Sequence, residues 1–369
     1  MNYMELDTPA LLIDREIMTD NIRRMQDHAD SWNVALRPHT KTHKMPELAK
    51  LQLEAGSKGI AVAKTGEAEV MARHGVRDIF IANEIVGDEK LERIATLQKD
   101  SLEISFGIDA PEHVRAAERI FGGAGLTAQV LIEIEVGENR SGIIEEADFL
   151  ILLEEIRTSP HVHLKGLFSH DGNSYDAATR EECLAIARGA QERTLRFAAL
   201  AREKGFSCEV VSYGSTPPLI NEAKILEGIT EIRPGTYILM DASMAATVGT
   251  LDHCAAKVLA TVISKPTPER VILDVGAKGL TMQERRDGIS ATPGKGTLAD
   301  YPGVFIDAVY DEHAIIYNRG FHDAVAIGDK VRIIPVHICP VCNLYGSAWL
   351  VSGEEVVREI PVAGRGMLL

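Results

Sequence analysis

The chain alternates between short apolar runs and longer segments in which apolar residues recur with a helical period. The apolar runs of strand length occupy residues 34–40, 59–63, 78–83, 103–109, 128–136, 163–170, 208–214 and 231–241. Segments 65–74, 88–98 and 176–204 between them have the spacing of amphipathic helices. Some runs, such as Ile79-Phe80-Ile81, are wholly apolar, which is typical of parallel strands buried on both faces. The pattern predicts eight strand–helix units, with only a short helical piece after the seventh strand.

This rhythm predicts an α/β fold built on a closed (β/α)8 barrel of the TIM type, and an open doubly wound sheet is the alternative. After about residue 245 the texture changes to strands joined by turns that contain glycine and proline. The strands expected there occupy residues 255–264, 270–275, 313–317, 330–336 and 354–361. At the start of the chain, the residue pattern predicts a strand over residues 8–14 and a helix over residues 15–30. We therefore predict a barrel over residues 15–245 and a second, mainly β domain from 1–14 and 246–369, with the boundary near 242–250.

Composition narrows the class of protein. The 369 residues are 45% apolar and 25% charged, which suits a globular protein of two domains. A net charge of −15 argues against nucleic acid or an anionic membrane as a partner. No apolar stretch is long enough to span a bilayer, and residues 1–7 lack the basic and apolar regions of a signal peptide. Five cysteines are too few for a disulfide framework, so we expect a cytoplasmic enzyme.

The first candidate for chemistry lies where the first barrel strand ends. Residues 37–44 read Arg-Pro-His-Thr-Lys-Thr-His-Lys. Functional groups of such barrels collect at the C-terminal ends of the strands, and Lys41 lies just past one of them. Partial burial would lower the pKa of its amine and allow it to form a Schiff base near neutral pH. The alternative is that Lys41 and Lys44 are solvated lysines in a turn.

Two later strand ends are rich in glycine and hydroxyl groups. The seventh run ends in Tyr-Gly-Ser-Thr-Pro-Pro at residues 213–218, and the eighth contains Arg-Pro-Gly-Thr-Tyr at residues 233–237. A phosphate needs backbone N–H groups and hydroxyls that converge without obstruction, and the loops after strands seven and eight of barrels are recurrent phosphate sites. Each segment alone is an ordinary turn. Together they predict a phosphate cradle formed by Gly214, Ser215, Thr216, Gly235 and Thr236.

A third motif lies in the second domain, where residues 337–344 read His-Ile-Cys-Pro-Val-Cys-Asn-Leu. If the strand from residue 330 continues, His337 and Cys339 project from the same face. An imidazole and a thiolate suit a divalent metal of the zinc type, with coordination positions left for water and substrate. Cys342 is a further candidate ligand. A Cys339–Cys342 redox pair is the rival interpretation, although the strand-then-helix context of such pairs is missing.

The lysine and metal motifs resemble those of the D-threonine aldolase and D-serine dehydratase family. Its members are fold-type III pyridoxal phosphate (PLP) enzymes related to alanine racemase. The resemblance implies that Lys41 carries the cofactor and that His337 and Cys339 bind the metal. The metal is expected to be zinc, with manganese, magnesium and cobalt as alternatives. The resemblance covers nearly the whole chain, from Thr-Pro-Ala at residues 8–10 to the metal motif.

The resemblance also implies roles for residues around the cofactor. His170, which ends Gly-Leu-Phe-Ser-His at 166–170, takes the position of a histidine stacked on the pyridine ring; alternatively it only caps a strand. Arg233 corresponds to an arginine that contacts the pyridine nitrogen. Arg140, in Glu-Asn-Arg-Ser-Gly at 138–142, matches an arginine near the phenolic oxygen; otherwise it is a surface arginine. Tyr175 and Tyr237 continue these motifs as further candidates for cofactor binding.

The function implied is a PLP- and metal-dependent dehydratase of a D-β-hydroxy amino acid. D-serine and D-threo-3-hydroxyaspartate are the leading substrates, and the products would be a 2-oxo acid and ammonia. Cys339 favours this branch because the aldolases typically have aspartate there. Asp274-Val275-Gly276-Ala277-Lys278 replaces the Gly-Tyr segment of the racemases, which argues against racemase activity. The rivals are retro-aldol cleavage to glycine and an aldehyde, and a PLP-binding protein without turnover. The family implies a homodimer.

Overall fold

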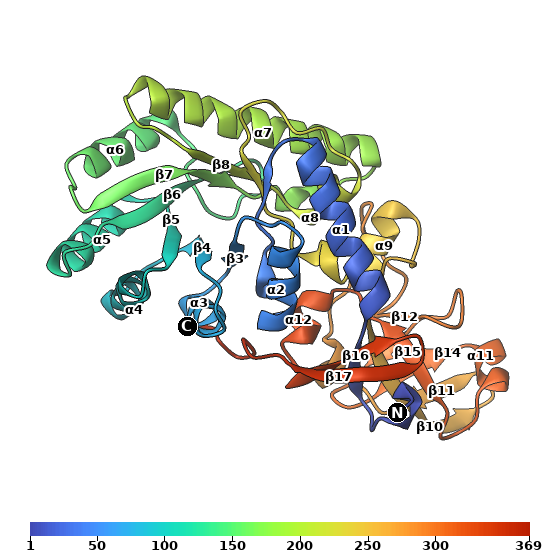
Figure 1. Ribbon diagram of the computed structural model, residues 1–369. Helices are drawn as coiled ribbons and strands as arrows, with labels where there is room; N and C mark the ends of the chain where they lie inside the picture. The colour runs from blue at the N-terminus through green and yellow to red at the C-terminus, as the bar shows by residue number, and fades with distance from the viewer.

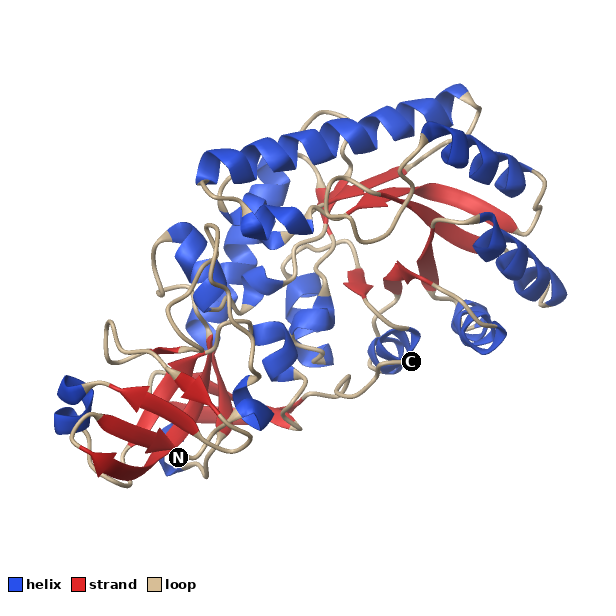
Figure 2. Ribbon diagram, turned by 180° about the vertical axis from the view of Figure 1, so that it is seen from behind, coloured by secondary structure: helices blue, strands red, loops and turns tan.

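The computed structural model describes all residues from 1 to 369 and has two parts, a barrel surrounded by helices and a separate part made mainly of strands (Figures 1 and 2). The barrel strands are parallel and pair in the order β2-β9-β8-β7-β6-β5-β4-β3. Their bounds are β2 (Ala35–Leu36), β3 (Ile60–Val62), β4 (Asp78–Glu84), β5 (Glu103–Ile108), β6 (Ala128–Ile134), β7 (Val162–Ser169), β8 (Val210–Tyr213) and β9 (Glu231–Ile232). The α/β class and the alanine racemase-like barrel predicted from the sequence are confirmed.

Backbone hydrogen bonds close the circle between the first and second barrel strands. Lys58 N donates to Leu36 O at 3.0 Å, and Ala61 N donates to Pro38 O at 2.8 Å. A cluster of five buried apolar side chains fills the interior of the barrel. It consists of Ala61, Phe80, Leu131, Phe168 and Val210. This layer of side chains is a packed floor, so the open space lies above it, at the carboxyl ends of the strands.

The helices of this part cover the outside of the strands. They are α1 (Arg15–Ser31), α2 (Pro46–Glu54), α3 (Thr65–Arg73), α4 (Asp88–Lys99), α5 (Pro111–Gly123), α6 (Glu146–Arg157), α7 (Arg180–Glu203), α8 (Thr216–Ile220) and α9 (Ala242–Val248). Short 3-10 helices follow three strands: η2 (Thr40–Thr42), η3 (Gly172–Asp176) and η4 (Thr236–Ile238). As predicted, only the short α8 follows the seventh strand. None of the helices is both long and apolar enough to cross a membrane.

Two predicted barrel strands are much shorter than their apolar runs. The run 34–40 forms only β2 before the chain turns into η2, and the run 231–241 forms only β9 before η4. Pro38 and Pro234 lie just after the shortened strands. Proline lacks a backbone N–H and restricts the residue before it, so it ends a central strand. This early ending turns Lys41 and Thr236 inward.

The second part is a nine-stranded sheet in the order β13-β14-β11-β10-β1-β16-β17, with β15 paired to β10 and β12. Its elements are η1 (Tyr3–Glu5), β1 (Ala10–Asp14), β10 (Ala256–Thr267), β11 (Arg270–Leu273), α10 (Ala277–Leu280), β12 (Thr297–Leu298), β13 (Ala308–Val309), β14 (Ala314–Tyr317), α11 (Arg319–Ala324), β15 (Lys330–Ile334), α12 (Ile338–Cys342), β16 (Ser347–Ser352) and β17 (Glu355–Pro361). The N-terminal strand β1 lies inside this sheet, antiparallel to β10 and parallel to β16.

Two of the contacts between the second part and the barrel involve the lysine segment. Helix α12 packs against η2, which contains Lys41. The C-terminal tail then runs back to α3, as Figure 1 shows, and Gly66 N donates to Leu369 O at 2.8 Å. Gly364 N donates to Lys44 O at 2.9 Å on the way. Both contacts hold the lysine segment between the two parts of the chain.

Candidate functional site

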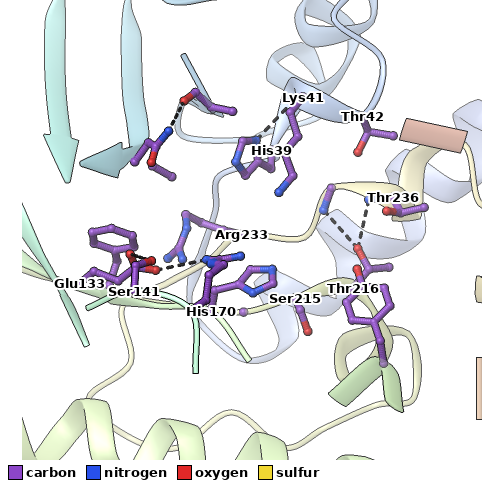
Figure 3. A pocket seen from close by; sticks show the side chains of 18 of the residues that line it. His39, Lys41, Thr42, Glu133, Ser141, His170, Ser215, Thr216, Arg233 and Thr236 are labelled. Atoms are coloured by element: carbon purple, nitrogen blue, oxygen red, sulfur yellow. Dashed lines mark hydrogen bonds and ion pairs between the residues drawn. The ribbon is translucent and has the colours of Figure 1, made fainter. Parts of the chain in front are cut away.

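A cavity of about 270 Å³ opens at the carboxyl ends of the barrel strands. Nineteen residues line it, and only four of them are hydrophobic. Figure 3 shows that side chains from many separate strand ends converge on it. Of the predicted site residues, the structure brings to this cavity Lys41, Arg140, His170, Tyr175, Gly214, Ser215, Thr216, Arg233, Gly235 and Thr236. A polar cavity built this way suits one small, charged ligand.

Lys41 points into the cavity from η2 (Figure 3). Burial lowers the pKa of its amine, and the nearby Arg140 acts in the same direction against the opposing Cys339. Lys44 is placed differently, because its Nζ lies 3.1 Å from Glu67 Oε1 and 3.0 Å from Asn343 Oδ1. The structure therefore separates the two lysines of the motif into one amine that faces a cavity and one that is held in an ion pair.

The imidazole of His39 forms the cavity wall beside Lys41 and was not among the residues predicted from the sequence. Its Nδ1 accepts from the backbone N of Lys41 at 3.5 Å, so it caps the turn that carries the lysine. Burial lowers the pKa of His39 well below its usual range, helped by the neighbouring Lys41 and Arg233. A neutral ring is therefore expected at this position. The histidine of the lysine motif was the available signal.

The five residues of the predicted phosphate cradle all line the cavity. Thr216 Oγ1 accepts from Gly235 N at 3.2 Å and from Thr236 N at 3.1 Å, which ties the two loops together. A Cβ on Gly235 would lie 2.9 Å from Thr42 Oγ1, so this close approach requires glycine. Two backbone donors of the cradle are thus already bound to a hydroxyl, while the side chains of Ser215 and Thr236 remain at the cavity wall.

Tyr237 lies outside the cavity. It is buried between helices, where Gln52 Nε2 donates to its hydroxyl at 2.8 Å. The two tyrosines of the predicted set therefore differ, because Tyr175 lines the cavity and Tyr237 does not. The turn of η4 explains the difference, since it directs Thr236 inward and its neighbour toward α2.

His170 follows β7 directly, and its ring lines the cavity. Its Nδ1 lies 2.8 Å from Glu138 Oε2. Any side chain at Gly172 would collide with the Glu138 carboxylate, so glycine there leaves room for this pair. Burial lowers the pKa of His170 although Glu138 opposes the change. The carboxylate fixes the orientation of the ring.

Arg140 lines the cavity beside two carboxyl groups, those of Glu133 and Glu84, that were not predicted from the sequence. Arg140 Nη2 lies 3.2 Å from Glu133 Oε1, and Ser141 Oγ donates to Glu133 Oε2 at 2.7 Å. Glu133 also shares a hydrogen bond with the carboxyl of Glu84. Burial and this neighbour raise the pKa of Glu84 to about 9, so Glu84 holds the proton of the pair. Carboxylates at the ends of two otherwise apolar runs were the signal in the sequence.

Arg233 enters the barrel from the end of β9. Its Nη1 donates to Ser212 Oγ at 2.6 Å and its Nη2 to Ser169 O at 2.7 Å. The guanidinium carbon lies 5.3 Å from the centre of the Phe168 ring, which is within the range of a cation–π contact. Burial lowers the pKa of Arg233 to about 10, which leaves it charged near neutral pH. Arg233 therefore supplies a positive charge to the base of the cavity.

The expected strand through His337 and Cys339 is wrong. Strand β15 ends at Ile334, and His337 is instead the residue that precedes α12. Pro335 follows the strand directly and cannot donate to the sheet, which accounts for the early end. The two side chains still meet, because the turn into α12 brings the His337 ring against the Cys339 thiol.

The thiol of Cys339 lies at the edge of the cavity. Its Sγ is 3.2 Å from Thr42 Oγ1 and 3.5 Å from Thr236 Oγ1, and both threonines line the cavity. Burial opposes ionisation of Cys339, but His337 and these hydroxyls outweigh it and lower the pKa. Gln283 Oε1 lies 3.0 Å from His337 Nδ1, which leaves Nε2 for other partners.

These two side chains fit a metal site that is open to solvent or substrate. No group of three or more histidine, cysteine or carboxylate side chains could enclose a metal anywhere in the chain. Cys342 is buried, and burial raises the pKa of its thiol well above the usual range, so it is a poor ligand. All five cysteines are free. One imidazole and one thiolate would leave the remaining positions of a divalent ion for exchangeable ligands.

Two family profiles match consecutive parts of the chain. "Alanine racemase, N-terminal domain" covers residues 13–243, and "Putative serine dehydratase domain" covers residues 255–351. D-threonine aldolase from Arthrobacter sp. is 35% identical over 98% of this chain and 93% of its own length. D-threo-3-hydroxyaspartate dehydratase from Delftia sp. is 30% identical over 91% of this chain and 92% of its own.

The solved structures give the same picture. The Delftia dehydratase superimposes with a TM-score of 0.91 at 28% identity, covering 98% of both chains. Two variants of D-threo-3-hydroxyaspartate dehydratase also match. One, in a metal-free form, has a cysteine replaced by alanine; the other has a histidine replaced by alanine two positions earlier.

Proposed function

This chain belongs to the family that joins an alanine racemase-type N-terminal domain to a serine dehydratase domain, and from that premise we propose that it is a dehydratase of D-β-hydroxy amino acids. It is a PLP-dependent lyase of D-amino acids, as its relatives are. The finer proposal is elimination of water from a substrate such as D-serine or D-threo-3-hydroxyaspartate. Hydrolysis of the released enamine by one water molecule then gives a 2-oxo acid and ammonia.

The cavity residues suit PLP. Lys41 offers the only lysine amine at the cavity wall, and Gly214, Ser215, Thr216, Gly235 and Thr236 offer hydroxyls and close backbone approach for a phosphate. The ring of His170 and the guanidinium groups of Arg140 and Arg233 lie around the space that remains. Bound PLP supplies an electron sink for negative charge at the substrate's α-carbon.

Different residues of the cavity can then transfer the proton and set the charge around it. Burial lowers the pKa of Lys41, so its Nζ is suited to take a proton from the α-carbon and to return one. The neutral rings of His39 and His170 exclude further positive charge from the same wall. Arg140 is held by Glu133 and keeps a fixed charge beside Lys41. These roles use only groups that already line the cavity.

His337 and Cys339 are proposed to hold a divalent metal, with zinc as the first choice because a thiolate is a soft ligand. Such a metal supplies a Lewis acid for the β-hydroxyl of the substrate. The position supports this, since the Cys339 thiol lies against Thr42 and Thr236 of the cavity wall. The observation that carries the dehydratase proposal is the cysteine itself. A histidine and a cysteine at the same spacing were replaced in the variants of the related dehydratase.

A second candidate is an aldolase that cleaves the bond between the α- and β-carbons. The 35% identity to D-threonine aldolase over 98% of the chain favours it. Both reactions start from the same substrates and the same cavity, so only the products separate them. A PLP-binding protein without turnover is disfavoured because the Cys339 thiol, from the second part of the chain, lies against Thr42 and Thr236 of the cavity wall.

Product analysis separates these candidates. Purified enzyme with PLP and zinc is incubated with D-serine, D-threo-3-hydroxyaspartate and D-threonine, and ammonia, 2-oxo acids, glycine and aldehydes are quantified. We expect ammonia and a 2-oxo acid in equal amounts with little glycine. Glycine and an aldehyde as the main products would refute the dehydratase and establish the aldolase. No product from any substrate would refute both.

Substitution of the cysteines tests the role of Cys339. Cys339→Asp should lower elimination and shift the preferred metal toward manganese or magnesium, because a carboxylate is a harder ligand. Cys342→Ala is the matched control, since the Cys342 thiol is fully buried and does not line the cavity. If Cys342→Ala loses the same fraction of activity under oxidising and under reducing conditions, Cys342 has a structural role. Loss that depends on the redox state would support the redox pair instead.

A further inference from the structure

The loop from residue 281 to 296 crosses from the second part of the chain to the mouth of the barrel. Backbone hydrogen bonds fasten it to the segment after β7, with Ile289 N donating to Ala177 O at 2.7 Å. Ser290 Oγ donates to Tyr175 O at 2.5 Å, and a Cβ on Gly288 would lie 2.8 Å from the Asp176 carbonyl. The loop is therefore fixed beside Tyr175, which lines the cavity.

Arg285 lies at the point where this loop meets the cavity wall. Its guanidinium carbon lies 4.7 Å from the centre of the Tyr175 ring. The Tyr175 hydroxyl is in turn hydrogen-bonded to Thr236, and Cys339 lies close to the same tyrosine. Gln283, two residues before Arg285, contacts His337. Arg285 is therefore adjacent both to the cradle side of the cavity and to the candidate metal ligands.

The charge of Arg285 is poorly compensated within the chain. Its one ion pair is with Asp176, at 4.0 Å, and the Asp176 side chain is 80% exposed. The buried Asp241 also attracts it electrostatically, but the two side chains form no ion pair. The neighbouring cations Arg286 and Lys295 each have a close carboxylate partner, because both pair with Glu284. Arg285 also lines a polar recess of about 290 Å³ that is formed by Asp176 and residues 283–287. A guanidinium stacked on a ring keeps its N–H edges free for a planar anion.

We propose that Arg285 binds a second carboxylate of the substrate, so that the enzyme prefers an acidic D-β-hydroxy amino acid, such as D-threo-3-hydroxyaspartate, over D-serine. This inference rests on the proposed function, because it assigns the substrate class of the same site. A substrate whose β-hydroxyl lies at His337 and Cys339 would carry its second carboxylate on the same carbon, close to the loop whose Gln283 contacts His337. An arginine whose only ion pair is a long one with an exposed aspartate favours a substrate with that extra negative charge.

The test compares two substrates in two variants. Arg285→Met removes the charge and keeps the length of the side chain. Its kcat/KM for D-threo-3-hydroxyaspartate should fall about ten- to a hundredfold, the range expected for a lost hydrogen bond to a charged group. Its kcat/KM for D-serine should change by less than about threefold, because that substrate lacks the second carboxylate. Arg285→Lys should recover part of the loss.

Arg286→Met is the matched control. Arg286 is the next residue of the loop, its side chain is 77% exposed, and its guanidinium pairs with Glu284. It should leave both kcat/KM values unchanged. A binding readout that needs no turnover is calorimetric titration with D-malate and D-lactate, which lack the amino group. Wild-type enzyme should bind D-malate more tightly than D-lactate, and Arg285→Met should remove the difference.

The outcomes separate this inference from the proposed function. An equal loss on both substrates in Arg285→Met would show that Arg285 serves a group common to them, such as the α-carboxylate, and would overturn the inference. Unchanged values on both substrates would overturn it as well. In either case measurable elimination by the wild type would leave the dehydratase standing, whereas absence of lyase products from every substrate would refute the proposed function itself.

Discussion

Arg37 is the first residue of the lysine motif, and replacing it should destabilise the barrel. Its side chain is 4% exposed and makes three hydrogen bonds inside the barrel. Nε donates to Glu231 Oε2 at 2.7 Å, and Nη1 and Nη2 donate to the two oxygens of Asp78 at 2.6 and 3.1 Å. One arginine thus joins the strands β2, β9 and β4 across the point where the circle closes.

The cost of Arg37→Met follows from what it leaves behind. The Glu231 side chain is 3% exposed and that of Asp78 is 17% exposed, so two carboxylates would lose their cation inside the protein. Removing one partner of a buried ion pair costs about 3–5 kcal/mol. Urea denaturation should show a loss of this size in the free energy of unfolding. PLP affinity should fall too, because Lys41 lies four residues further along the same segment.

Two comparisons make the result specific. Arg358→Met removes an exposed ion pair with Glu47 and should cost less than about 1 kcal/mol. Neutralising the carboxylates in Arg37→Met, by adding Glu231→Gln and Asp78→Asn, should recover part of the lost stability. If Arg37→Met costs no more than Arg358→Met, the reasoning about the buried network is refuted.

Three further predictions concern the cavity. After borohydride reduction of the PLP-loaded enzyme, peptide mapping should place the pyridoxyl group on Lys41, whereas a label on Lys44 would contradict the assignment. Chelators should abolish lyase turnover while PLP stays bound, and added zinc should restore it; loss of both together would indicate that a metal at His337 only maintains the fold. The pKa of Glu84 is raised to about 9, so the stability it contributes is present at low pH and is lost as pH rises toward that value. Glu84→Gln keeps a hydrogen-bond donor to Glu133 but does not titrate. In urea denaturation, the free energy of unfolding of this variant should therefore rise relative to that of the wild type between about pH 5 and about pH 9. A difference in unfolding free energy that does not change with pH would contradict the shared proton.

Much of the architecture was available in the sequence because it depends on local patterns. Along residues 34–241, apolar runs that alternate with amphipathic segments predict buried parallel strands and the helices that cover them. The lysine motif and the Gly-Ser-Thr loop could be assigned to strand ends for the same reason, and a barrel brings its strand ends to one face. The structure places Lys41 and Thr216 on that face accordingly.

The tertiary structure decided the features that depend on residues far apart in the chain. The pairing of Glu84 with Glu133, and the position of Arg285 over Tyr175, need neighbouring strands and a loop from the other domain. The turn that joins His337 and Cys339 also differs from the strand predicted by alternation, because Pro335 ends the sheet. Periodicity reports only how a segment divides its side chains between inside and outside. Which buried groups meet, and whether a charge finds its partner, is set by the packing of distant elements, and no local pattern records it.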